Sequence, residues 1–191
     1  SELQPEESTT FTAGFVFEPL KNLVLAVDYY NIEIENLIGL TGETSIFEDP
    51  TKYADRFVRD ADGRIQYINT TLMNTGGIKT EGIDISLDYL TPMTSTGRFG
   101  FGINGTYVIK NDYQEEKDGD WERVVGVYDD PAVLRWKHTA NINWSYEDWK
   151  LVFEQQFFRG YHDQNATGEE GFDHHTVPDY TLSNIAGTYT G

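Results

Sequence analysis

The stretch that most constrains the fold is "EGIDISLDYL", residues 81–90, where apolar and polar side chains alternate without a break. The odd positions carry the apolar side chains of Ile83, Ile85, Leu87 and Tyr89. A period of two is the signature of a β-strand, because successive side chains of an extended chain point to opposite faces. Such a strand lies between two different surroundings. In a soluble sandwich the apolar face meets a second sheet, whereas in an outer-membrane barrel it meets lipid and the polar face lines the lumen.

The same alternation predicts seven strand segments along the chain. They are residues 8–18, 22–38, 77–90, 97–110, 133–146 and 149–161, and a last segment that starts near Tyr180. In the second segment the apolar residues change from odd to even positions beyond Tyr29, which indicates either a bulge near Asn31 or a strand that extends past its apolar surroundings. No helical periodicity competes with these segments, so the sequence predicts an all-β, antiparallel fold.

Composition excludes several classes of protein. The 191 residues include 32 acidic and 14 basic side chains, for a formal net charge of -18, which argues against nucleic acid because phosphates are bound by clustered Lys and Arg. The sequence has no run of about 18 apolar residues, so it predicts no transmembrane helix. It also has no Cys and no recognisable nucleophile arrangement, and we expect no enzyme and no bound cofactor. Only 38% of the residues are hydrophobic, which suits sheets with one apolar face better than a thick core.

The connections between the segments favour a barrel. Short connections, "EPLKN", "LTPMTSTG" and "YEDW", alternate with long polar loops at residues 39–73, 112–130 and 163–177. Outer-membrane barrels have short turns at one end and long external loops at the other, whereas a sandwich has no reason to sort its loops. The first long loop contains "FVRDADGRIQYI", in which Asp-Gly between two alternating runs predicts a hairpin.

Strand length and aromatic placement point the same way. A bilayer is crossed by about 9–11 tilted strand residues, whereas globular strands usually have about 5 or 6. Aromatic residues, whose rings suit the membrane interface, gather near the expected strand ends. Those near the short turns are Phe17, Tyr89, Trp144, Tyr146 and Trp149, and those near the long loops are Tyr107, Trp136 and Tyr161.

Several segments, taken in order, resemble the β-barrel of TonB-dependent outer-membrane receptors. They are "LQPEESTTFTAGFVFEP", "LVLAVDYYNIEIENLIG", "NTGGIKTEGIDISLDY", "LRWKHTANINWSYEDWKLVFEQQFFRGYHDQN" and "YTLSNIAGTYTG". The resemblance implies an up-and-down transmembrane barrel of 22 strands, of which this chain supplies about seven. The family's plug domain, its TonB-contact segment and a closing strand that ends in an aromatic residue are not recognisable in the sequence. We therefore expect residues 1–191 to be a partial barrel domain without its plug.

The resemblance also implies a function. Members of this family import scarce, bulky nutrients such as ferric siderophores, cobalamin, haem or oligosaccharides, by loop capture and TonB-driven plug movement. The expected location is the bacterial outer membrane, and the expected partners are the TonB complex through the plug, the nutrient, outer-membrane lipid and lipopolysaccharide. Two alternatives stay open: a passive porin or structural barrel, and a soluble sugar-binding β-sandwich.

Five residues are candidates for binding a nutrient. Arg135 and Lys137 have the polar parity of their segment and lie close to a long loop, where they could attract an anionic ferric complex or pair with carboxylates of a plug or neighbouring strand. Tyr113, Trp121 and Tyr128 belong to the second long loop, where aromatic rings could stack on a sugar or a catecholate, or anchor the loop by packing.

Two loops contain residues from which a metal site would be built. Asp118 and Asp120 belong to the acidic run "NDYQEEKDGDWE", whose oxygens suit calcium, although the fixed positions of an EF-hand are missing. His174 and His175 lie beside Asp173, and imidazole with carboxylate suits a transition metal. Adjacent strand residues point apart, so both imidazoles could reach one ion only in irregular backbone. We expect solvated loop charges here and no resident metal.

Overall fold

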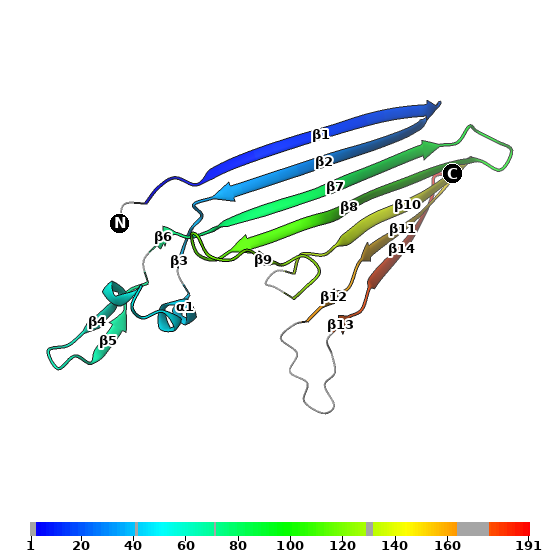
Figure 1. Ribbon diagram of the computed structural model, residues 1–191. Helices are drawn as coiled ribbons and strands as arrows, with labels where there is room; N and C mark the ends of the chain where they lie inside the picture. The colour runs from blue at the N-terminus through cyan, green and yellow to red at the C-terminus, as the bar shows by residue number, and fades with distance from the viewer. Residues whose placement is uncertain (1–2, 41, 71, 129–131, 164–175) are drawn as a thin grey trace. The chain divides into compact units, whose positions relative to one another are not determined.

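The computed structural model describes residues 3–40, 42–70, 72–128, 132–163 and 176–191. Seven long strands form one sheet in which each long strand pairs with the next one along the chain (Figure 1). In sheet order they are β1 (Glu7–Leu20), β2 (Leu23–Glu35), β7 (Gly77–Leu90), β8 (Arg98–Gln114), β10 (Trp136–Tyr146), β11 (Trp149–Phe158) and β14 (Tyr180–Tyr189). The seven predicted segments and the up-and-down topology are confirmed.

Contacts divide the chain into two compact units. The loop unit comprises Ser1–Thr9, Glu33–Lys79 and Tyr113–Glu122, and the sheet unit comprises Thr10–Ile32, Thr80–Asp112 and Arg123–Gly191. The four strands β1, β2, β7 and β8 each contribute residues to both units. None of the helices in the described parts of the chain is long and apolar enough to cross a membrane.

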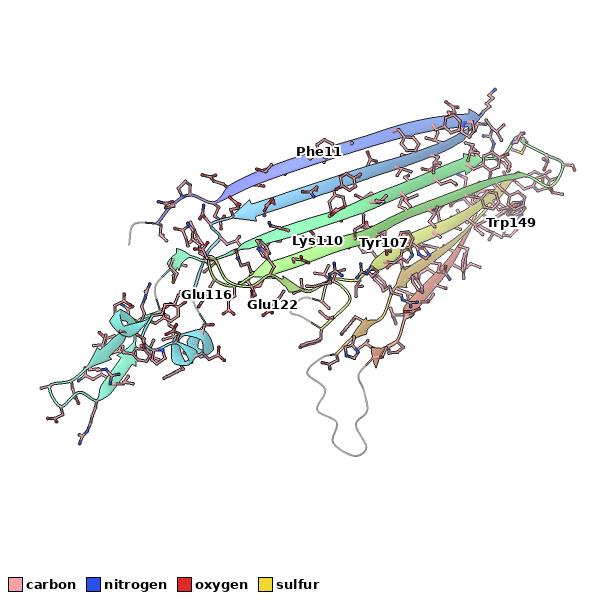
Figure 2. All side chains as sticks on the ribbon, viewed as in Figure 1. Phe11, Tyr107, Lys110, Glu116, Glu122 and Trp149 are labelled. Carbon is pink, nitrogen blue, oxygen red and sulfur yellow. The ribbon has the colours of Figure 1, made fainter. Side chains whose placement is uncertain are left out.

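The sheet unit has one apolar and one polar face. On the apolar face Ile142 pairs with Phe101 and Phe153, whereas the next residue, Asn143, pairs with Gly100 and Val152. The three apolar side chains remain 43%, 39% and 39% exposed, because no second layer of described residues covers them. Figure 2 shows Phe11, Tyr107 and Trp149, aromatic residues of β1, β8 and β11 that are also exposed.

Two polar residues of β10 and β11 share the apolar parity. Gln155, which the sequence indicated, pairs with Ala140. His138, which the sequence did not single out, accepts a hydrogen bond from the Trp136 indole nitrogen to Nδ1 at 2.8 Å, and its ring stacks on Phe157 with centroids 5.2 Å apart. The imidazole is thus enclosed by aromatic rings and keeps a hydrogen-bond partner, as a polar group on an apolar face requires.

The short connections lie at one end of the long strands. Two residues, Lys21 and Asn22, join β1 to β2, and Glu147 and Asp148 join β10 to β11. Asn22 has φ 65° and Glu147 has φ 51°, and tight hairpins need such left-handed residues to match the strand twist. The Trp144 indole nitrogen donates to the Thr96 carbonyl at 2.8 Å, which ties the longer β7–β8 connection to β10.

Strand β8 contains one residue more than its partner β7. The Thr106 hydroxyl donates to Asp84, and five residues further along β8 the Asn111 amide donates to Thr80, only four residues away from Asp84 on β7. Both contacts need the two side chains on the same face, so one extra residue, a β-bulge, lies between Thr106 and Asn111. The strict alternation read through residues 97–110 therefore does not continue to the end of the strand.

Strands β2 and β7, in contrast to β7 and β8, pair in one register without a bulge. The Leu90 amide bonds the Asn22 carbonyl at the short-turn end, and Glu33 pairs with Lys79 near the long loops. Eleven residues separate the contacts on each strand (33 − 22 and 90 − 79), so neither strand has a net extra residue between them. Of the two alternatives for the changed parity beyond Tyr29, the register favours a strand that extends past its apolar surroundings.

The loop unit contains a small core of its own. The elements of the loop unit include helix α1 (Glu43–Glu48), the 3-10 turn η1 (Ala54–Arg56), the hairpin β4 (Phe57–Arg59) with β5 (Ile65–Ile68), and the pair β3 (Ile38–Leu40) with β6 (Leu72–Asn74). Ile46, Tyr53 and Phe57 are buried against one another, and Ile68 packs on them. We define residues 42–70 as the helix–hairpin module.

The Asp-Gly hairpin of the first long loop is confirmed. Asp60 accepts hydrogen bonds from the amides of Asp62 and Arg64, and Gly63 takes φ 82°. The sequence did not predict helix α1, because its six residues are too few to show a helical period. Three further short strands are β9 (Glu122–Arg123), which pairs with β8, and the pair β12 (Tyr161–His162) with β13 (Thr176–Val177).

Candidate functional site

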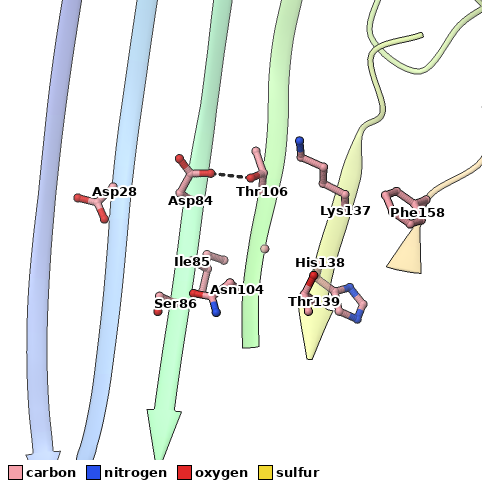
Figure 3. A pocket seen from close by; sticks show the side chains of 11 residues that line it. Asp28, Asp84, Ile85, Ser86, Asn104, Thr106, Lys137, His138, Thr139 and Phe158 are labelled. Atoms are coloured by element: carbon pink, nitrogen blue, oxygen red, sulfur yellow. Dashed lines mark hydrogen bonds between the residues drawn. The ribbon is translucent and has the colours of Figure 1, made fainter. Parts of the chain in front are cut away.

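A row of side chains crosses the polar face of the sheet unit. Lys137 on β10 pairs with Thr106 on β8 and with Phe158 on β11. The Thr106 hydroxyl donates to Asp84 Oδ1 at 2.7 Å, and Asp28 lies on the next strand, β2 (Figure 3). The row thus combines two carboxylates, a hydroxyl, an ammonium group and an aromatic ring from five neighbouring strands.

This row lines a hollow of about 480 Å³ on the polar face. Its other lining residues are Ile85, Ser86, Asn104, Gly105, His138 and Thr139 (Figure 3). Ligand pockets typically enclose about 300–1,000 Å³ and hold a few polar groups that fix orientation. Lys137 is the one Lys or Arg among the described lining residues, and it forms no ion pair within the described parts of the chain. Its ammonium group is therefore available to a ligand, in a lining that also holds the carboxylates of Asp28 and Asp84.

Arg135, predicted beside Lys137 as an anion-binding residue, has a different contact. One of its guanidinium nitrogens, Nη1, donates to the Val108 carbonyl at 3.3 Å and to the Ile109 carbonyl at 3.0 Å. Successive carbonyls of a regular strand point to opposite sides, so a single nitrogen reaches both only where the strand is irregular. Arg135 therefore fastens the bulge of β8, and only Lys137 of this pair lines the hollow.

The three predicted aromatic residues belong to two different units of the chain. Tyr128 is 44% exposed in the sheet unit, where its amide donates to the His162 carbonyl at 2.7 Å and its ring centroid lies 6.4 Å from that of Tyr161. Tyr113 and Trp121 belong to the loop unit and are 37% and 36% exposed. Tyr113 follows Asn111 by two residues on β8 and so shares its parity beyond the bulge, which is the parity of the polar face.

The candidate metal ligands are partly described. Asp118 and Asp120 lie in the loop unit, and across the described ranges no group of three or more His, Cys, Asp or Glu side chains comes close enough to share an ion. Asp118 takes φ 64° and lines a second pocket of about 330 Å³, whose lining residues all belong to the loop unit. His174 and His175 lie outside the described residues.

Sequence reasoning missed a cluster that joins the first two long loops. The Ser45 hydroxyl donates to Glu115 Oε1 at 2.6 Å, and the neighbouring Glu116 accepts hydrogen bonds from the Lys52 ammonium and the Tyr53 hydroxyl. We call these five residues the carboxylate latch. It fastens the helix–hairpin module to the acidic segment at residues 113–122. The adjacent acids in "QEEKD" were visible, but their partners lie more than 60 residues away and no local pattern identifies them.

The latch perturbs its own titratable groups. Hydrogen bonds from Lys52 and Tyr53 lower the pKa of Glu116 below its ordinary value of 4.5. The same hydrogen bond raises the pKa of Lys52 above 10.5, and burial, followed by the contact with Glu116, raises the pKa of Tyr53 above 10.0. Each shift favours the protonation state in which the carboxylate is ionised and both donors keep their protons.

The fold and its uncovered apolar face are those of a segment of an outer-membrane β-barrel. The family model for the TonB-dependent receptor-like β-barrel matches residues 1–190, so the chain belongs to that family. Its members and the solved structures below are receptors and transporters rather than enzymes. No curated protein matches the chain in sequence. The soluble β-sandwich that the sequence left open is wrong, because the sheet is a single layer throughout the described residues and the family is a membrane barrel.

Three solved structures illustrate the similarity. A variant of the ferric enterobactin receptor of Pseudomonas aeruginosa matches with 15% identity and a TM-score of 0.61, over 97% of this chain and 24% of that one. The FrpB iron transporter of Neisseria meningitidis matches with 10% identity and a TM-score of 0.60, over 98% and 25%. The siderophore receptor PirA of Acinetobacter baumannii matches with 14% identity and a TM-score of 0.60, over 98% and 26%. The chain thus spans about a quarter of the length of these structures.

Proposed function

We propose that the chain is part of the barrel wall of an energy-coupled importer in a bacterial outer membrane. The whole protein would capture a scarce nutrient with its long loops and pass it through the barrel when the TonB complex moves a plug domain. Residues 1–191 would form a partial barrel domain, closed by strands outside this sequence into a 22-stranded barrel. The rival proposal, a passive porin or structural barrel, uses the same wall without energy coupling.

One observation supports a membrane location most directly. The long strands have 10 to 17 residues, enough to cross a bilayer, and their apolar face has no protein cover among the described residues. An apolar surface of this extent in water would be an aggregation site, since monomeric soluble proteins rarely expose large contiguous apolar patches. Hydrocarbon is the surrounding that suits it, with the polar face toward a lumen.

The polar-face hollow is the proposed contact of the nutrient with this part of the barrel. Lys137 would attract an anionic group of the cargo, while Asn104, Thr106 and Thr139 offer donors and acceptors. Tyr128, which belongs to the same unit, would add aromatic surface. A ferric siderophore is the first cargo to test, because the similar structures are a ferric enterobactin receptor, an iron transporter and a siderophore receptor. Cobalamin, haem and oligosaccharides are the further classes.

The experiment uses the full-length receptor in cells that lack their own copy. Uptake of radiolabelled ferric siderophores, cobalamin and haem is compared in cells with and without functional TonB. We expect accumulation of one cargo that stops when TonB is removed. Accumulation that continues without TonB would favour a passive porin, and the absence of uptake for every cargo would contradict an importer of these classes.

A matched pair of variants tests the hollow. Lys137→Glu reverses the charge that faces the hollow, whereas Lys150→Glu reverses a charge at the short-turn end of β11, outside the lining of the hollow. We expect the first variant to weaken binding of an anionic ferric complex about tenfold, or about 1.4 kcal/mol, and the second to leave it unchanged. If both variants bind the ferric complex with equal affinity, Lys137 does not contribute to the site.

A further inference from the structure

Two carboxylates of the polar-face hollow lie directly opposite each other on neighbouring strands. The Leu90 amide bonds the Asn22 carbonyl, and Asp84 precedes Leu90 by six residues as Asp28 follows Asn22 by six. The single register of β2 and β7 therefore places the two aspartates opposite each other, and Figure 3 shows them at the same level of the sheet. Like charges in directly opposite positions destabilise a sheet. The pair thus costs stability unless a cation neutralises it.

No cation among the described residues neutralises the two aspartates. Asp84 accepts a hydrogen bond from the Thr106 hydroxyl, which is a neutral donor, and the Asp28 carboxylate forms neither a hydrogen bond nor an ion pair within the described parts of the chain. A Cβ placed on Gly14 of β1 would overlap the Asp28 carboxylate, so this carboxylate leans over the glycine and away from β7. The lean separates the two negative charges without neutralising either. Both aspartates are exposed and open to a ligand.

Lys137 provides a positive charge at the other side of the same hollow. In the strand order β2-β7-β8-β10 it lies two strands from Asp84 and three from Asp28. Neighbouring strands are about 4.8 Å apart, so the strand of Lys137 lies about 10 Å from that of Asp84 and about 14 Å from that of Asp28. Salt largely screens exposed charges at such separations. The hollow therefore has a negative end and a positive end that do not neutralise each other.

An organic cation suits the negative end better than a metal ion does. Calcium takes about six to eight oxygen ligands, and within the described ranges no group of three or more His, Cys, Asp or Glu side chains could hold an ion. An ammonium or guanidinium group needs fewer partners, because its N–H groups donate charge-assisted hydrogen bonds to one or two carboxylates. The volume of about 480 Å³ has the size of a small-molecule site.

We propose that the hollow selects a zwitterionic cargo, whose ammonium or guanidinium group binds at Asp28 and Asp84 and whose anionic group binds at Lys137. A ferric siderophore with a free amine and a free carboxylate, separate from its iron-binding groups, has this chemistry. A complex that has only negative charges binds less tightly, because the two aspartates repel it. The inference rests on the proposed function for the presence of a cargo, and it adds the requirement for a positive group.

The test measures the binding of three ferric trihydroxamates to the purified full-length receptor in detergent. All three have the same neutral, linear iron-binding core. The first carries an ammonium group and a carboxylate at its ends, the second has the amine acetylated, and the third lacks the carboxylate. We expect the first complex to bind the parent about tenfold more tightly than either of the others, or by about 1.4 kcal/mol.

Variants assign this preference to the two aspartates. The double variant Asp28→Asn/Asp84→Asn should bind the first and the acetylated complex equally, because no negative charge is left for the ammonium group. Asp88→Asn should keep the tenfold preference, since Asp88 lies four residues further along the same face of β7 and outside the lining of the hollow. Equal binding of the two complexes to the parent would overturn the proposal, and so would the absence of binding by all three complexes.

Two further measurements separate charge selection from other roles of the aspartates. Because the two carboxylates repel each other, the double variant should resist urea at least as well as the parent when no complex is bound. A lower resistance would mean that the carboxylates engage another part of the receptor, such as its plug, and would overturn the proposal. TonB-dependent uptake is measured in parallel. If the acetylated complex is taken up as fast as the first complex, the importer stands and only the selection of a positive group is wrong.

Discussion

The core of the helix–hairpin module and the apolar face of the sheet differ in how far their side chains are covered. In the helix–hairpin module Ile46 is 1% exposed and Tyr53 4% exposed, whereas in the sheet unit Ile142 is 43% exposed and Phe101 39% exposed. Isoleucine therefore occurs both as the most buried side chain of the loop unit and as one of the uncovered side chains of the sheet. The protein itself encloses the three core residues of the module, Ile46, Tyr53 and Phe57, whereas the apolar face of the sheet at Ile142, Phe101 and Phe153 has no cover among the described residues.

The difference agrees with the proposed surroundings, which are water for the module and hydrocarbon for the apolar face of the sheet. A structure in water gains stability only from apolar area that protein atoms cover, so even a module of some 30 residues assembles a core. In hydrocarbon, apolar side chains need no protein cover, and the main requirement is that every backbone N–H and C=O finds a partner. The long strands meet that requirement by pairing in sequence order, and the strands at the two edges of this sheet would meet it through the rest of the barrel.

The largest expected effect concerns the core of the module. Ile46→Ala removes the most deeply buried side chain and should cost about 2–5 kcal/mol of local stability. Phe47→Ala, which truncates the 57% exposed neighbour, should cost much less. In the full-length receptor, limited proteolysis would show cleavage within residues 42–70 for Ile46→Ala while the barrel stays resistant to heating in detergent. Loss of the barrel as well would contradict two separately stabilised units.

The second prediction concerns the apolar face of the sheet. Ile142→Arg places a charge toward lipid and should cost about 2–4 kcal/mol if the residue lies near the bilayer midplane. Asn143→Arg, one residue further along β10 on the polar face, should be nearly neutral. The measurement is the fraction of full-length receptor that folds into lipid vesicles over a urea series. Equal losses for both variants would mean that the two faces do not have different solvents.

The third prediction concerns the bulge of β8. Arg135→Met leaves the carbonyls of Val108 and Ile109 without their charged donor, and the expected cost is about 1.5–3 kcal/mol. Arg159→Met removes an exposed arginine whose ion pair with Asp179 should contribute about 0.2–1 kcal/mol. The same folding assay compares them, and a smaller loss for Arg135→Met than for Arg159→Met would show that the guanidinium does not hold the bulge.

The sheet could be predicted from sequence, and the loop unit largely could not. Alternation over ten or more residues, as in 81–90, defines a strand and its two faces from local information alone. The Asp-Gly hairpin was equally local. Helix α1 and the carboxylate latch were missed because their formation depends on contacts such as Tyr53 with Glu116, between loops distant in sequence.

The candidate site was predicted only in part, for a related reason. Parity alone placed Arg135 and Lys137 on the same face and therefore in the same role. The bulge of β8 separates them, because it presents two carbonyls that engage the arginine and leaves the lysine beside the hollow. Parity likewise predicted no contact for Trp121, which lies in a loop, and its ring packs over Gly77 within the loop unit.

The smallest expected effect concerns the carboxylate latch. Glu116→Gln keeps the shape of the side chain but removes the charge that Lys52 and Tyr53 engage, and we expect a cost of about 1 kcal/mol to docking of the module. Because the pKa of Glu116 is lowered in the folded protein, its contribution is present above pH 4.5 and is lost as the pH falls through the lowered pKa. The raised pKa of Lys52 gives the opposite limit: its contribution is present below pH 10.5 and is lost as the pH rises through the raised value.

The measurement is the protection of residues 42–70 from hydrogen exchange as a function of pH. In the parent receptor this protection should be greatest between the two limits and should fall in acid, and this fall is the acid limb. Glu116→Gln should lose the acid limb, whereas Glu122→Gln, which changes an exposed acid on β9 (Figure 2), should keep it. An acid limb that persists in Glu116→Gln would assign the pH dependence to another carboxylate, such as Glu115 beside Ser45, rather than to Glu116.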